Sequence, residues 1–104
     1  MRKHIALAAA IGAASFALQA PVHAQDFSKI RYLAANCANC HGTDGRSVGV
    51  MESLAGYDKD KFITNMKEFR SGDKPATLMH QIVKGYTDQQ IADLAVYFAA
   101  QRKK

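Results

Sequence analysis

Apolar residues recur at helical spacing in the stretch that precedes the only two cysteines of the chain. The spacing i, i+3, i+4 and i+7 is that of one face of an amphipathic helix. The residues on this face are Ile30, Leu33, Ala34 and Cys37. The pattern predicts a helix over residues 27–36, with Ser28 or Asp26 as its N-cap.

A second apolar stripe predicts a helix over residues 57–70, with Asp58 as N-cap and Ser71-Gly72 as its end. Its face consists of Phe62, Ile63, Met66 and Phe69. Since Met66 repeats in phase with the two phenylalanines, we interpret it as a core side chain rather than a ligand.

The C-terminal part contains a helix break, a short segment and a last helix. Residues 73–76 include Pro75 and interrupt the pattern before a short segment over residues 77–84, which Gly85 ends. The run Thr87-Asp88-Gln89-Gln90 matches a capping box and predicts a helix from residue 88 to about 101. Its face is Ile91, Leu94, Ala95 and Phe98, with Tyr97 at the edge. No alternating strand pattern is present, so the predicted fold class is all-α.

The N-terminus has the pattern of a secretory signal peptide. Arg2 and Lys3 precede an apolar stretch at residues 5–18, and Val22-His23-Ala24 places small residues at the cleavage positions. A membrane anchor is the alternative, but the stretch is shorter than the ~20 residues of a membrane span. We expect cleavage after Ala24, which leaves one small domain over residues 25–104 and places the protein in the periplasm.

The predicted domain carries only a weak positive charge. Without Arg2 and Lys3 it has 12 basic and 9 acidic residues, a net charge of +3, and several of the cations lie in Arg102-Lys103-Lys104. The sequence has no basic stripe with interleaved aromatic residues, so nucleic-acid binding is not indicated.

The two cysteines form the motif Cys37-Ala38-Asn39-Cys40-His41. On a helix the two thiols lie about 300° apart around the helix axis, so they can flank one flat ligand. The histidine that follows them can approach the centre of the same ligand from one face. This motif predicts thioether attachment of a haem by Cys37 and Cys40, with His41 as proximal iron ligand. A redox disulfide would be expected in a βαβ setting, and a zinc site would need more paired ligands than the chain offers.

The glycine-rich stretch after His41, at residues 42–49, is predicted to be a loop that turns the chain away sharply. It lacks the Gly-Lys-Ser/Thr ending of a phosphate-binding loop. Arg46 is a candidate partner for a haem propionate, although a solvated side chain is the alternative.

Several motifs together resemble the class I bacterial cytochromes c, over essentially the whole predicted domain. They are Cys37-Ala38-Asn39-Cys40-His41-Gly42, Ser53-Leu54-Ala55-Gly56, Phe69-Arg70-Ser71-Gly72, Met79, Lys84-Gly85-Tyr86-Thr87 and Leu94-Ala95-Val96-Tyr97-Phe98. The chain looks most like small monohaem domains of the cytochrome c4 and c553 type, and among these like cytochrome subunits of flavocytochrome c sulfide dehydrogenases. The resemblance implies a small cytochrome c fold of about four helices around one covalent haem c.

The resemblance also implies the remaining site residues. The sixth iron ligand of the family matches Met79, with Met51 as its main rival and His80 as a minor alternative. A loop carbonyl of the family accepts the Nδ1 proton of the proximal histidine. Here Glu52 stands where relatives often have proline, so which residue supplies that carbonyl stays open.

The family packs its first and last helices together, which matches Leu33 against Leu94 and Tyr97, with Leu33 where an aromatic residue is common. The implied function is a periplasmic one-electron carrier rather than an enzyme, with a flavoprotein dehydrogenase as redox partner. A freely diffusing shuttle to an oxidase or reductase is the alternative. An open-site haem enzyme or gas sensor is a second alternative, and it requires that Met79 not bind the iron.

Overall fold

The structure, a computed structural model, describes residue 12 and residues 27–103. The predicted signal peptide lies outside the described residues except for Gly12. The described helices are α1 (Ser28–His41), α2 (Lys59–Ser71), α3 (Met79–Ile82) and α4 (Asp88–Ala99), with two 3-10 turns, η1 (Thr43–Gly45) and η2 (Val83–Gly85). No strand occurs among residues 27–103, which confirms the all-α prediction.

Helix α1 is longer than predicted and starts differently. It continues five residues past the predicted end at Asn36 and carries the whole cysteine motif to His41. Its N-cap is Phe27, without a capping side-chain hydrogen bond, so Ser28 lies inside the helix and its prediction as N-cap was wrong. The alternative cap, Asp26, lies outside the described residues.

The stretch after α1 contains the turn η1 instead of being loop throughout. Gly42 ends α1 with φ +83° and ψ 167°, a conformation that only glycine adopts readily. Downstream, the N–H groups of Leu54 and Ala55 donate to the Gly45 carbonyl, at 2.8 and 3.1 Å, and the Gly56 N–H donates to the Phe98 carbonyl at 2.8 Å. The returning chain is thereby fixed to α4.

Helix α2 has both predicted caps. The Asp58 carboxylate accepts a hydrogen bond of 2.8 Å from the Lys61 N–H, and Gly72 ends the helix with φ +86°. Met66 is 4% exposed, which confirms its prediction as a core residue.

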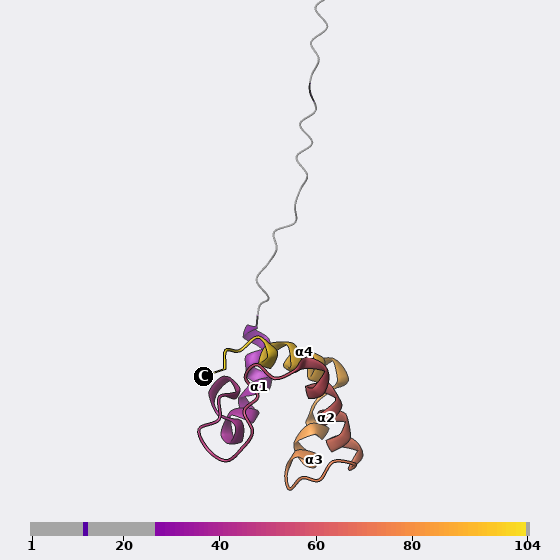
Figure 1. The fold of residues 1–104 in the computed structure, drawn as a ribbon. Helices are drawn as coiled ribbons and strands as arrows, with labels where there is room; N and C mark the ends of the chain where they lie inside the picture. Colours follow the sequence, from indigo (N-terminus) through magenta and orange to yellow (C-terminus); the bar gives the residue numbers. More distant parts are fainter. Residues whose placement is uncertain (1–11, 13–26, 104) are drawn as a thin grey trace, which may run out of the picture.

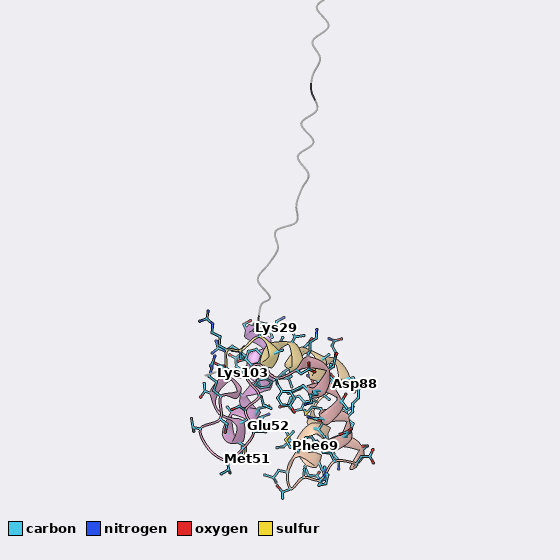
Figure 2. All side chains as sticks on the ribbon, in the orientation of Figure 1. Lys29, Met51, Glu52, Phe69, Asp88 and Lys103 are labelled. Carbon is cyan, nitrogen blue, oxygen red and sulfur yellow. The ribbon has the colours of Figure 1, made fainter. Side chains whose placement is uncertain are left out.

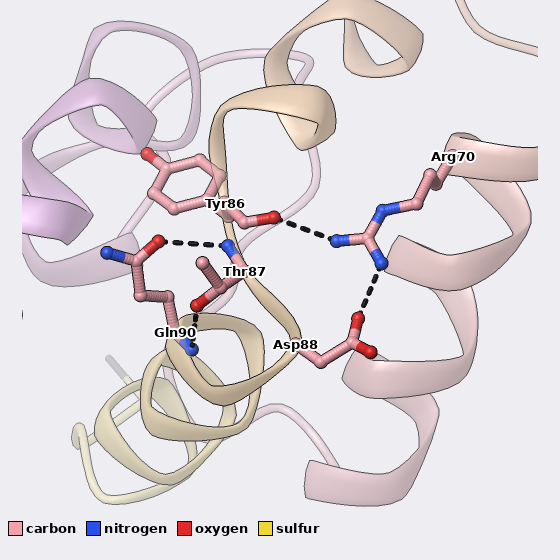
Figure 3. A network of polar contacts seen from close by, with 5 residues as sticks. All are labelled: Arg70, Tyr86, Thr87, Asp88 and Gln90. Carbon is pink, nitrogen blue, oxygen red and sulfur yellow. Dashed lines mark hydrogen bonds and ion pairs between the residues drawn. The ribbon is translucent and has the colours of Figure 1, made fainter.

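The predicted capping box of α4 is present in full (Figure 3). The Gln90 N–H donates to the Thr87 hydroxyl at 3.1 Å, and the Thr87 N–H donates to the Gln90 side chain at 2.9 Å. Beside it, Arg70 of α2 donates to the Asp88 carboxylate and to the Tyr86 carbonyl, at 2.5 and 2.8 Å. The start of α4 is thus joined to the end of α2.

Helix α4 forms the centre of the core and contacts both α1 and α2 (Figure 1). Its predicted face is buried: Ile91, Leu94, Ala95 and Phe98 are each at most 1% exposed. Tyr97, predicted at the edge of this face, is also buried, with 3% of its surface exposed, and its hydroxyl donates to the Asp44 carboxylate.

Helices α1 and α4 contact each other as predicted, and Leu33 packs against the core as a partly buried residue. The aromatic contribution to this contact comes from Phe27, whose ring lies edge-on to Tyr97 with centroids 5.4 Å apart. A residue just before the helix therefore supplies the ring that Leu33 lacks.

Within the described part of the chain, no helix is long and apolar enough to cross a membrane.

Candidate functional site

A cavity of about 310 Å³ is lined by α1 and the stretch after it and by α2 and α3. Figure 1 shows α1 on one side of the molecule and α2 and α3 on the other. The cavity volume is at the lower end of the ~300 to 1,000 Å³ range of small-molecule sites. Apolar side chains line much of it, among them Leu54, Phe62, Met66, Phe69, Leu78 and Ile82. Such a lining suits a large apolar ligand.

The last turns of α1 bring the cysteine motif to the wall of this cavity, where Cys37, Cys40 and His41 all line it. Cys37 is half-buried and Cys40 exposed, and both are free thiols. Burial raises the pKa of the Cys37 thiol, against the smaller effect of a hydrogen bond with Tyr86. A raised pKa is the opposite of what a reactive redox thiol needs.

The chemistry of the ligand set also disfavours zinc. Among residues 27–103, no group of three or more histidine, cysteine, aspartate or glutamate side chains is arranged to hold a metal ion. A structural zinc site needs four such ligands.

The orientation of His41 is set by a backbone carbonyl. Its Nδ1 lies 2.5 Å from the carbonyl oxygen of Glu52. Because a carbonyl only accepts hydrogen bonds, Nδ1 carries a proton, and in the neutral imidazole the lone pair is then on Nε2. The predicted contact between His41 and a loop carbonyl is confirmed. The sequence did not determine which residue supplies this carbonyl, and the structure shows that it is Glu52.

Two methionines line the cavity from different segments. Met79 is the first residue of α3, is partly buried and packs against the core. Met51 stands in the stretch between η1 and α2 with 45% of its surface exposed. A thioether that is held by packing is better placed to be a fixed ligand than one on an exposed loop.

His80 and Arg46 do not line the cavity. The Nε2 of His80 lies 2.5 Å from the Lys74 carbonyl oxygen. The Arg46 Nε–H donates to the Arg102 carbonyl at 2.8 Å, and its guanidinium lies 3.6 Å from the Asp44 carboxylate. Arg46 thus joins the turn η1 to the C-terminal end of the chain.

One polar pair in the cavity wall was missed in the sequence. The Asn65 side-chain amide donates to the Tyr57 hydroxyl at 2.8 Å, and both residues line the cavity. Burial and the charge of Glu52 raise the pKa of Tyr57, so its hydroxyl stays protonated and can donate. Asn65 lies three positions after Phe62, on the apolar stripe of α2. A polar residue at such a position could have indicated a polar contact within the apolar wall.

The residues present fit a haem c. Two unpaired thiols and an imidazole with a free Nε2 come from α1, a thioether comes from α3, and the wall between them is largely apolar. The Tyr57 and Asn65 pair offers polar atoms for a polar edge of the ligand.

Comparison with known proteins points the same way. The cytochrome c family model matches residues 29–101. The cytochrome subunit of sulfide dehydrogenase from Chlorobaculum tepidum is 38% identical over 77 residues, which cover 74% of this chain and 70% of that protein.

Two other relatives are similar at lower identity. Cytochrome c-554(548) of Halomonas halodenitrificans is 33% identical, with 62% of this chain and 83% of that protein covered. Cytochrome c4 of Pseudomonas aeruginosa is 34% identical. The aligned region covers 66% of this chain and 35% of that protein.

Proposed function

Because the chain belongs to the cytochrome c family, whose members carry electrons on covalently bound haem c, we propose that it is a periplasmic one-electron carrier with one His/Met-ligated haem. The observation that carries the proposal is the cavity itself, where the cysteine motif, the oriented His41 and Met79 meet. Export rests on the signal-peptide pattern at residues 1–24.

In this proposal Cys37 and Cys40 form the thioethers, His41 binds the iron through Nε2, and Met79 is the sixth ligand. A bound haem supplies reversible one-electron chemistry at its iron. The Glu52 carbonyl holds the His41 proton on Nδ1 and so keeps Nε2 available as a ligand. The apolar wall from α2 and α3 would surround the haem with apolar side chains. If His41 and Met79 both held the iron, no coordination position would be left for a substrate, and this would separate a carrier from a haem enzyme.

We propose a flavoprotein dehydrogenase, similar to sulfide dehydrogenase, as the electron donor. The support is the similarity to a protein named as the cytochrome subunit of sulfide dehydrogenase. A freely diffusing shuttle is the alternative. It is supported by the similarity to cytochromes that are not named as subunits of an enzyme.

The ligand assignment is tested by comparing Met79→Ala with Met51→Ala in the haem-loaded protein. Met79→Ala should keep the covalent haem, bind carbon monoxide when reduced, and show a lower reduction potential within the ~0.8 V range that axial ligands set. Met51→Ala removes the same type of side chain from the same cavity. It should match wild type in its covalent haem, its lack of carbon monoxide binding and its reduction potential. If Met51→Ala gives the changes instead, Met79 is not the ligand, and if wild type already binds carbon monoxide, the open-site alternative holds.

The partner is tested by an affinity pull-down. Tagged, haem-loaded protein is incubated with periplasmic extract of the organism that produces it, and the bound proteins are identified. Recovery of a flavoprotein in 1:1 ratio that reduces the haem on addition of sulfide supports the dehydrogenase subunit. Absence of any flavin in the eluate, together with reduction by other periplasmic donors, supports the shuttle.

A further inference from the structure

The segment that presents Met79 has little regular structure of its own. Helix α3 contains only four residues, and its N-cap, Leu78, makes no capping side-chain hydrogen bond. Before it, residues 73–78 form a bent connection from α2 that includes Pro75, which has no N–H to donate. A side chain at the start of so short a helix needs support from elsewhere to keep one position.

The two ends of this connection are attached to helices by the backbone. The Lys74 N–H donates to the Glu68 carbonyl of α2 at 3.2 Å. At the other end the Leu78 carbonyl accepts from the N–H groups of Gln81 and Ile82, at 3.0 and 3.1 Å.

His80 joins these two ends. Its Nε2 lies 2.5 Å from the Lys74 carbonyl oxygen, so the imidazole donates a hydrogen bond that closes residues 74–80 into a ring. Neighbouring residues on a helix point about 100° apart. His80 can therefore face Lys74 while Met79 lines the cavity.

Phe69 of α2 lies close to both the imidazole of His80 and the ammonium of Lys74. The Phe69 ring centroid is 6.2 Å from that of His80, and the Lys74 ammonium lies 5.9 Å from the Phe69 centroid. Figure 2 shows Phe69 beside α3. Phe69, His80 and the Lys74 carbonyl thus form a clamp between α2 and the start of α3.

We propose that His80 is a positioning residue that keeps Met79 at the cavity by closing the ring of residues 74–80. This inference rests on the proposed role of Met79 as iron ligand. A fixed ring restricts the alternative conformations in which Met79 would swing out of the cavity, so it favours the methionine over competing ligands.

The test is the affinity of the ferric, haem-loaded protein for imidazole, which must displace the methionine to bind. His80→Leu keeps an apolar contact with Phe69 but removes the donor, and it should bind imidazole about three- to tenfold more tightly than wild type, as expected for one lost hydrogen bond. His80→Gln can place an amide N–H near the position of Nε2 and should restore most of the wild-type affinity. Gln81→Leu, the matched control, replaces an exposed polar residue of the same short helix and should leave imidazole affinity unchanged.

The outcomes separate the clamp from the ligand assignment. Unchanged imidazole affinity in His80→Leu, even with a lower unfolding midpoint, overturns the positioning role and leaves only a structural one. An affinity gain in Gln81→Leu equal to that of His80→Leu also overturns it. Met79→Ala is measured alongside: if it fails to raise imidazole affinity, the ligand assignment fails, whereas a gain there and none in His80→Leu refutes the clamp alone.

Discussion

Gly42, which directly follows His41, has the conformation least compatible with any other residue. Its φ of +83° and ψ of 167° fall in a region that is essentially restricted to glycine. A Cβ built there lies 2.0 Å from the Arg46 carbonyl oxygen and 2.8 Å from the Ser47 nitrogen. Both neighbours are backbone atoms, so neither can rotate away as a side chain could.

We expect Gly42→Ala to destabilise the haem-loaded protein by about 2 to 6 kcal/mol. The backbone conformation alone costs about 1 to 3 kcal/mol for a residue with a Cβ. Displacing the Arg46 backbone adds about 1 to 3 kcal/mol, as for an overpacked core. Since small domains have only about 5 to 15 kcal/mol of total stability, this loss is a large fraction of it.

The assay is guanidinium unfolding of the haem-loaded protein, followed by circular dichroism, with free energies from linear extrapolation. Gly49→Ala is the matched control, because Gly49 lies in the same stretch, lacks a positive φ and has no atom within 4 Å of a built Cβ. The control should change stability by less than about 1 kcal/mol, in the stabilising direction. A loss below about 1 kcal/mol in Gly42→Ala would refute the assignment of strain to this turn.

Two further predictions concern α4. Burial and then the hydrogen bond to Asp44 raise the pKa of Tyr97 to about 12, above the unfolded value of about 10. The stabilisation from this shift is therefore complete below pH 10 and is lost as the pH rises from about 10 to 12. Urea midpoints measured across this range should fall in wild type and fall less in Tyr97→Phe, and equal slopes would contradict the shift. Thr87→Ala removes the acceptor for the Gln90 N–H and should cost about 1 kcal/mol of unfolding free energy, while Thr87→Ser should keep most of it. Equal losses in the two variants would show that the hydroxyl does not stabilise α4.

Local signals predicted the caps of α2 and α4, because each depends on residues close in sequence. Asp58 caps α2 and Gly72 ends it, and the Thr87 and Gln90 capping box starts α4 as expected. The end of α1 was missed because the apolar stripe fades after Cys37, while the polar residues that follow remain compatible with a helix.

The contacts that sequence reasoning missed depend on how the chain folds back on itself. The Tyr97 hydroxyl donates to the carboxylate of Asp44, 53 residues away, and no periodicity within α4 carries that information. The clamp of His80 on Lys74 depends on the path of a short connection, which residue types alone do not define. For the site, the motif indicated Cys37, Cys40 and His41, and the resemblance indicated Met79; the structure brings all four to one cavity, and their binding of the iron stays a prediction.

The hydrogen bond that orients His41 ends on a main-chain oxygen, and every amino acid has that oxygen. Position 52 can therefore exchange its side chain without loss of the acceptor, provided that the backbone keeps its path. The histidine's electronic environment is in this way uncoupled from the outward-facing surface of the same loop, where Val48 and Val50 are almost fully exposed. Substitutions at the surface of this loop therefore need not change the tautomer of His41.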